Sequence, residues 1–340
     1  MIFPPSPLEH ARTLAAGCVL MVLSACARLE AECSQPSEVE GEGDLRVLTY
    51  NIGNNSGSGP HALRIRDRAY EDHVGERIRM LEADIVFLQE VLAPPRCERT
   101  SEAFEPERAC HGLTRRDAPA KRLLGGEYTV VCDANQHVEC IGVRASFGSI
   151  RGVPLRGFGL DKAQTASLPG PACDYLAGDC DGKSTECDSE SSISTVVVDT
   201  PKYGAIRLIH VHPTAIGEIC RSRQLEQAFA MADDLPTIMG GDWNFDPSRL
   251  ADVAATALWA DWVGANRRFR DHSGYAEDCR LDRTSFGQDA SLDRIVTDFG
   301  RGRCHVWAQP RLDEAFEFTK LTVGRIDHYA VDCSLDSEIQ

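Results

Sequence analysis

The sequence lacks several features that would place it in a familiar class. It contains no C-x-x-C pair, no cysteine–histidine group with the spacing of a zinc site and no internal repeat, so structural zinc is not expected. Basic residues are scarce: 36 Lys and Arg face 52 Asp and Glu, and the formal net charge is −16 at pH 7. Such a surface argues against binding nucleic acid through bulk electrostatics. It still allows nuclease chemistry, because a divalent metal and a local basic loop can hold one phosphate.

The N-terminal apolar run, residues 14–23, is too short to cross a bilayer and is typical of an export signal spanning residues 1–25. It leads into Leu-Ser-Ala-Cys, which resembles the lipidation site of bacterial lipoproteins and makes Cys26 the lipidated residue. Ala27, in place of an Asp, favours the outer membrane or cell surface. The alternative is an ordinary cleaved signal, which would give a periplasmic or secreted protein.

Cysteine is the next informative residue type. Of 14 cysteines, Cys18 and Cys26 belong to the signal and the lipidation site, which leaves 12 in the body of the chain. An exported chain meets an oxidising compartment, so up to six disulfides are expected. One of them is predicted between Cys97 and Cys110, within a polar segment that we interpret as a long loop.

The body of the chain divides by composition. Residues 26–43 are polar, acidic and glycine-containing, which favours a flexible tether after the lipidated cysteine. Residues 44–340 are predicted to form the folded domain, with irregular, cysteine-bearing insertions near 93–127 and 145–192.

Apolar periodicity within this domain predicts more strands than helices. Strands are expected at 45–51, 84–90, 128–132, 139–143, 193–199, 205–212, 236–239, 292–297 and 328–333. Helices are expected at 64–82, at 218–233 and near 248–258. The two kinds of element do not alternate as in a doubly wound sheet. We therefore predict an α/β fold in which two packed mixed β-sheets are flanked by helices, a four-layer sandwich.

The stretch 238–244, Ile-Met-Gly-Gly-Asp-Trp-Asn, carries the most specific chemical signal. An apolar strand runs into two glycines, and Asp242 and Asn244 follow at once. On extended backbone two side chains two residues apart point the same way. A carboxylate beside a carboxamide could accept a proton from a water nucleophile and orient it. The alternative is an Asx-rich turn that merely closes the strand.

Other polar residues stand within or at the ends of apolar strands. They are Asn51, Glu90, His212, Asp293 and the Asp327-His328 pair. Any one of them is weak evidence, because a polar residue at a strand end is usually solvated. Together they indicate one polar site at the rim of the sheets.

With these motifs in place, the chain from about residue 44 to 334 resembles the endonuclease/exonuclease/phosphatase superfamily. That superfamily includes deoxyribonucleases, abasic-site endonucleases, bacterial sphingomyelinases and inositol polyphosphate phosphatases. The resemblance rests on Thr-Tyr-Asn51-Ile, Leu-Gln-Glu90-Val, His212, Gly-Asp242-Trp-Asn244, Leu-Asp293-Arg-Ile and Ile-Asp327-His328. The departures are His210 for an Asn, Pro213 for a Leu, Trp243 for a Phe and Ile326 for a Ser.

The resemblance implies a deoxyribonuclease-like fold and specific roles. Glu90, with Asp327 and Asn51, would hold Mg²⁺, or alternatively Mn²⁺ or Ca²⁺. Asp242 would take a proton from the attacking water, and Asn244 would orient that water or contact the phosphate. His328, polarised by Asp293, and His212 would donate to the phosphate or the leaving oxygen.

Two questions about the site stay open at this stage. His210 and His212 lie on the same face of a strand, so either could be the catalytic histidine, although His212 occupies the strand end. The basic residues Arg115 and Arg116, together with His210, are candidates for contacting an anionic substrate.

The expected function is an exported, lipid-anchored, Mg²⁺-dependent phosphoesterase that hydrolyses phosphodiesters by in-line water attack, with nuclease activity as the first hypothesis. A sphingomyelinase, a phospholipase-type enzyme or an inositol-phosphate phosphatase is the alternative. A non-catalytic surface-binding domain of the same fold is a third. We expect a monomer that meets the membrane only through its N-terminal lipid.

Overall fold

The computed structural model describes most of the chain from residue 44 onward. The described ranges are 44–53, 67–92, 94–97, 106–114, 118–133, 138–161, 172–173, 187–188, 192–215, 217–248, 253–273, 290–307 and 330–336. Five of the candidate site residues fall outside these ranges, namely Cys26, Arg115, Arg116, Asp327 and His328. Within the described ranges, none of the helices is both long enough and apolar enough to span a membrane.

The first sheet is mixed and has seven strands in the order β14-β15-β1-β2-β4-β3-β6. The strands are β1 Leu45–Asn51, β2 Ile85–Gln89, β3 Tyr128–Asp133, β4 Cys140–Arg144, β6 Phe158–Asp161, β14 Arg301–Trp307 and β15 Ala330–Asp336. The pairs β1/β2 and β3/β6 are parallel, whereas the other neighbours are antiparallel.

The second sheet is also mixed and has six strands in the order β12-β13-β11-β10-β9-β5. The strands are β5 Ser149–Ile150, β9 Ser192–Thr200, β10 Gly204–His212, β11 Thr237–Asp242, β12 Arg270–Asp271 and β13 Asp293–Thr297. Only β10 and β11 run parallel in this sheet. A separate short pair joins β7 Ala172–Cys173 to β8 Cys187–Asp188.

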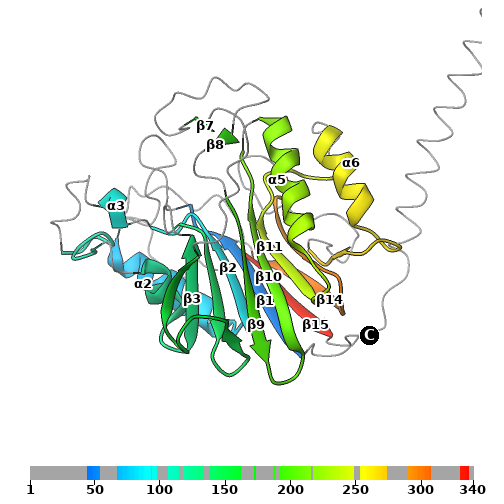
Figure 1. The fold of residues 1–340 in the computed structure, drawn as a ribbon. Helices are drawn as coiled ribbons and strands as arrows, with labels where there is room; N and C mark the ends of the chain where they lie inside the picture. The colour runs from blue at the N-terminus through cyan, green and yellow to red at the C-terminus, as the bar shows by residue number, and fades with distance from the viewer. Residues whose placement is uncertain are drawn as a thin grey trace, which may run out of the picture. The chain divides into compact units, whose positions relative to one another are not determined.

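Five helices complete the described secondary structure. They are α2 Arg68–Met80, α3 Pro94–Cys97, α4 Pro119–Leu124, α5 Glu218–Met231 and α6 Val253–Trp262. In Figure 1, α2 lies beside the strands of the first sheet, whereas α5 and α6 lie beside those of the second.

Strand alternation explains why the elements form four layers. In β1, Leu45 and Val47 join the core between the sheets, whereas Leu48 and Tyr50 join the core beneath α2 and α4. The same switch occurs in the second sheet, where inner residues such as Ile238 face the first sheet and outer residues such as Met239 pack with α5 and α6. Both faces of each sheet are therefore buried, and the predicted two-sheet α/β sandwich is confirmed.

The two predicted insertions contain more structure than expected. The segment 93–127 was interpreted as a loop but includes α3 and α4, and 145–192 includes β5, β6, β7 and β8. Strand β14 was also not expected. Its sequence, Arg-Gly-Arg-Cys-His-Val-Trp, carries charge at alternate positions of an edge strand and so lacks an apolar run.

Disulfides tie several of these elements together. The predicted Cys97–Cys110 bond is present. Two further bonds join neighbouring strands of the first sheet: Cys132–Cys140 links β3 to β4, and Cys304–Cys333 links β14 to β15.

Candidate active site

The inner faces of both sheets change from apolar to polar at one end. In β1 the inner positions Leu45 and Val47 are followed by Thr49 and Asn51, and in β10 Ile206 and Leu208 are followed by His210 and His212. In β11 and β13, Asp242 and Asp293 occupy the paired inner positions at the same end. The polar residues of both sheets are therefore brought together at one rim, as the strand-end motifs predicted.

Two glycines allow β11 to pack closely against its neighbours, which places Asp242, the last residue of β11, at the rim. A Cβ atom on Gly240 would lie 2.2 Å from the ring of Phe87 in the other sheet. Gly241 has a φ of 155°, and a Cβ there would lie 1.8 Å from the carbonyl oxygen of Val211. The Gly-Gly pair is thus required by packing against Phe87 at Gly240 and by the backbone at Gly241, and is not a mere turn signal.

Asn51 links two carboxylates across the sheet interface. Its Nδ2 donates to Oε1 of Glu90 and to Oδ2 of Asp242, each at 3.1 Å. Its Oδ1 accepts the backbone N–H of Gly53 at 2.9 Å, which fixes the amide in this orientation. Asn51 and Glu90 come from the first sheet and Asp242 from the second, so this amide holds both halves of the site together.

Glu90 and Asn244 both adopt left-handed backbone conformations, with φ of 53° and 51°. Asn tolerates this region, but for a Glu it is uncommon and costs about 1–3 kcal/mol. In Asn244 the backbone N–H donates to Oδ1 of Asp242 at 2.9 Å, and Nδ2 donates to the carbonyl of Pro213 at 2.9 Å. These bonds set the orientation of the Asn244 carboxamide beside Asp242.

His212 is held by a carboxylate that the sequence did not reveal. Its Nδ1 lies 2.7 Å from Oε1 of Glu139, a buried residue just before β4, and its Nε2 lies 3.9 Å from Oδ2 of Asp242. Burial alone would lower the pKa of His212, but Glu139, with Asp242 and Glu90, outweighs burial and raises it to about 10. Burial also raises the pKa of Glu139 to about 7, against the opposing attraction of His212. His212 is therefore cationic at neutral pH.

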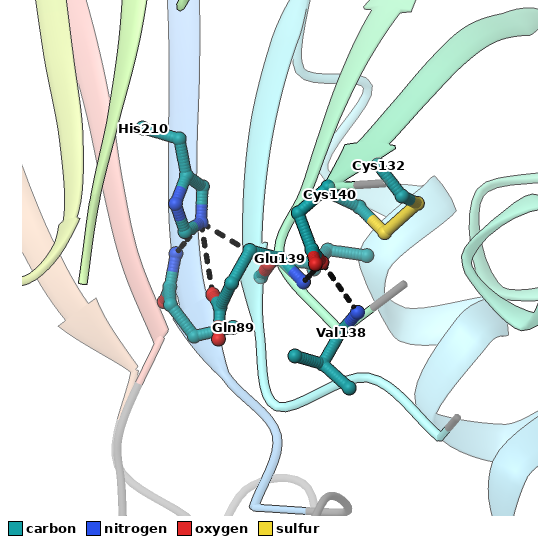
Figure 2. Close-up of a disulfide and its surroundings, with 8 residues drawn as sticks. Gln89, Cys132, Val138, Glu139, Cys140 and His210 are labelled. Atoms are coloured by element: carbon teal, nitrogen blue, oxygen red, sulfur yellow. Dashed lines mark hydrogen bonds and ion pairs between the residues drawn. A yellow bond between two sulfur atoms is a disulfide. The ribbon is translucent and has the colours of Figure 1, made fainter. Parts of the chain in front are cut away.

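His210 occupies a different environment although it lies on the same face. Its side chain is fully buried, with Nε2 2.9 Å from Nε2 of Gln89 and 3.2 Å from the Leu88 carbonyl oxygen. Oε2 of Glu139 lies 3.4 Å from the same ring nitrogen (Figure 2). Burial, followed by repulsion from His212, lowers the pKa of His210 to about 3. His210 is consequently a neutral interior residue behind His212.

The structure brings most of the predicted site residues together. Those gathered at the rim are Asn51, Glu90, His212, Asp242, Asn244 and Asp293, and His210 lies in the interior behind them. Arg115, Arg116, Asp327 and His328 lie outside the described residues.

Glu139 was not predicted as a site residue because the strand-end motifs lie mainly at the carboxyl ends of strands. Since β4 is antiparallel to β2, its amino end meets the carboxyl end of β2 at the same rim. A polar residue just before an apolar strand was the signal that could have found it.

The donors present suit a hard cation. Glu90 offers carboxylate oxygen, the atom type that Mg²⁺ prefers. The amide oxygen of Asn51 accepts the Gly53 N–H, and its second lone pair would serve a cation. The described part of the chain contains no group of three His, Cys, Asp or Glu side chains placed to hold a metal. The third predicted ligand, Asp327, lies outside that part.

Comparison with known proteins identifies the fold. No protein-family model and no curated protein matches the sequence. Among solved structures, a functionally unknown conserved protein from Enterococcus faecalis V583 aligns with a TM-score of 0.52 and 10% identity, over 86% of this chain and 99% of that chain. An endonuclease/exonuclease/phosphatase from Bacteroides vulgatus aligns with a TM-score of 0.52 and 14% identity, over 86% and 98%. The chain therefore has the endonuclease/exonuclease/phosphatase fold, and the resemblance seen in the sequence is confirmed at the level of the fold.

Proposed function

We propose that the chain is a metal-dependent phosphoesterase that hydrolyses a phosphodiester by direct attack of water. The observation that carries this proposal is the Asn51 amide, which bonds both Glu90 and Asp242 beside the cationic His212. A general base, a cation and an oxygen-donor metal site within one rim are the components that phosphoryl transfer requires.

The residues at the rim take separate roles in this reaction. Asp242 accepts the proton of the attacking water, and Asn244, oriented by Asp242 and Pro213, positions that water. His212 donates from Nε2 to a non-bridging phosphate oxygen while Glu139 holds its Nδ1. Glu90 and Asn51, with the predicted Asp327, would hold Mg²⁺, which when bound would supply positive charge to neutralise the phosphate.

The bond changes balance without a covalent intermediate. The water oxygen forms a bond to phosphorus, its proton passes to Asp242, and the opposite phosphorus–oxygen ester bond breaks. The predicted His328, with Asp293 as its partner, protonates the leaving oxygen. This is in-line displacement, and its acceleration comes from donors directed at the transition state.

Export is part of the proposal. Three disulfides between described residues favour an oxidising compartment. We infer that residues 1–25 direct export and that Cys26 anchors the protein to the outer membrane or cell surface. This anchor would also bring lipid phosphodiesters within reach, which makes them the second substrate class after nucleic acid.

The test compares residues 27–340, folded under oxidising conditions, with the Asp242→Ala variant. Both are assayed with Mg²⁺ and with EDTA against duplex DNA, RNA, sphingomyelin and bis-p-nitrophenyl phosphate. Asp261→Ala, an exposed change on α6, is the matched control. Metal-dependent turnover that is lost only in Asp242→Ala supports the enzyme, and the preferred substrate separates nuclease from lipase. A folded, oxidised protein without turnover on any substrate contradicts the phosphodiesterase proposal and favours the binding-domain alternative.

A further inference from the structure

The backbone that carries Glu139 is held by a compact set of hydrogen bonds. Oδ1 of Asp133 accepts the N–H groups of Val138 and Glu139, at 2.8 and 3.0 Å. The Asp133 N–H donates back to the Glu139 carbonyl at 2.9 Å, and the Val91 N–H donates to the Val138 carbonyl at 2.9 Å. The backbone donors and acceptors of Val138 and Glu139 are therefore all used, and one of these bonds comes from the residue that follows Glu90.

A disulfide adjoins these hydrogen bonds. Cys132 and Cys140 lie directly opposite each other in the β3/β4 register and are bonded. Cys132 precedes Asp133, and Cys140 follows Glu139. The disulfide therefore joins the two strands at the residues next to Asp133 and Glu139. Figure 2 shows the disulfide beside Glu139, with His210 on the other side of the carboxylate.

Glu139 has little tolerance for displacement. Its carboxylate is fully buried and lies 2.7 Å from Nδ1 of His212 and 3.4 Å from Nε2 of His210. A hydrogen bond at this distance is lost when either partner moves by about 1 Å. Since Glu139 sets the orientation of His212, a displacement of the backbone at Glu139 would also displace the His212 ring.

We propose that Asp133 and the Cys132–Cys140 disulfide are positioning elements of the active site, which hold Glu139 against His212. The inference rests on the proposed function through His212. It makes turnover sensitive to the redox state of the Cys132–Cys140 disulfide. The Cys304–Cys333 bond of the same sheet is also buried but joins β14 to β15, at the other end of the strand order.

Two pairs of variants test the inference in the full chain. Cys132→Ala/Cys140→Ala is compared with Cys304→Ala/Cys333→Ala, which removes an inter-strand disulfide between β14 and β15. Asp133→Ala is compared with Asp133→Asn, whose amide oxygen can still accept the two N–H groups. We expect kcat to fall roughly ten- to a hundred-fold, with little change in KM, in Cys132→Ala/Cys140→Ala and Asp133→Ala. The Cys304→Ala/Cys333→Ala and Asp133→Asn variants should keep most of the turnover.

A second readout does not depend on activity. The proton on Nδ1 of His212, bonded to Glu139, should give a downfield imidazole signal in the proton NMR spectrum, assigned by its loss in His212→Asn. This signal should disappear in Cys132→Ala/Cys140→Ala and Asp133→Ala while the amide spectrum stays dispersed, and it should persist in the two comparison variants.

The outcomes separate the two proposals. If the wild-type chain hydrolyses nothing, the proposed function fails, and the His212 signal alone decides whether the positioning elements exist. If Cys132→Ala/Cys140→Ala and Asp133→Ala keep both kcat and the signal, the inference is overturned. It is also overturned if Cys304→Ala/Cys333→Ala loses both to the same extent, because the effect would then be general destabilisation.

Discussion

Oε1 of Glu139 lies 2.7 Å from Nδ1 of His212, although Glu139 precedes a strand of the first sheet and His212 ends a strand of the second. The contact joins a buried carboxylate to a buried imidazole, and it is the largest of the effects that raise the pKa of His212. It therefore determines the pH range in which His212 can act as a cationic donor.

Glu139→Gln should lower the upper limit of the pH range in which His212 is cationic. Without the carboxylate, the pKa of His212 falls from about 10 toward or below its ordinary value, because burial then acts with less opposition. Turnover should fall most at pH 8 and least at pH 6, and a pH–rate profile measures this. Glu127→Gln, at an exposed position, is the control. An alkaline limb at the same pH in the Glu139→Gln variant would contradict the role assigned to His212.

Asn51→Asp should destabilise the metal-free protein. It places a third carboxylate 3.1 Å from both Glu90 and Asp242, and we expect a loss of about 1–3 kcal/mol in the free energy of unfolding in EDTA. Added Mg²⁺ should restore part of this loss, because the new oxygen is a cation ligand. Asn51→Ala removes the amide that bonds both carboxylates without adding a charge. Mg²⁺ should therefore raise the free energy of unfolding of this variant by a smaller amount. Urea unfolding with and without Mg²⁺ measures both, and equal gains would argue against a metal at this position.

Gly240→Ala and Gly241→Ala should each cost at least about 1–3 kcal/mol of stability and abolish turnover. The new methyl group would meet the ring of Phe87 in one case and the backbone of Val211 in the other. Gly126→Ala is the control, since nothing lies within 4 Å of the added Cβ. Thermal unfolding of the three variants makes the comparison. A stable, active Gly241→Ala protein would show that β11 does not approach β10 as described.

His272 should contribute to acid unfolding. Burial lowers its pKa to about 4, and its Nε2 lies 2.8 Å from Oγ1 of Thr297. Because the folded-state pKa lies below the unfolded value near 6.5, the contribution is fully present above pH 6.5. It is lost as the pH falls through 4, up to roughly 3 kcal/mol.

The variant His272→Gln, which does not titrate, should therefore lose less stability than the wild type between pH 7 and pH 4. Urea unfolding at both pH values measures this, with the exposed His111→Gln as the control. Some acid sensitivity should remain in His272→Gln, because His210 also has a lowered pKa. Parallel stability curves for the wild type and His272→Gln would contradict the assignment.

The sequence predicted the central strands because their residues alternate between two apolar environments. Leu45 and Leu48 in β1 are recognisably buried on opposite faces, and the segment around Asp242 is short and apolar. Elements without such a signal were missed. Helix α4 has six residues beside a cysteine-bearing segment, and the two-residue strands β5 and β12 are defined only by their partners.

Most of the polar residues that the structure places at the rim were named individually from the sequence, but their contacts were not. Asn51 and Asp242 are 191 residues apart, and their hydrogen bond depends on how one sheet packs on the other. Nothing local to Asn51 indicates that its amide joins two carboxylates. Glu139 was not predicted for the same reason. It lies at the site only because β4 runs antiparallel to β2.

The division of the site between the two sheets also divides it along the chain. Asn51, Glu90 and Glu139 precede the insertion at 145–192, whereas His212 and Asp242 follow it. A single cut within that insertion would thus yield two fragments, one with Asn51, Glu90 and Glu139 and one with His212 and Asp242. Neither fragment would contain the whole site, and mixing them would rebuild it only as the two sheets repacked.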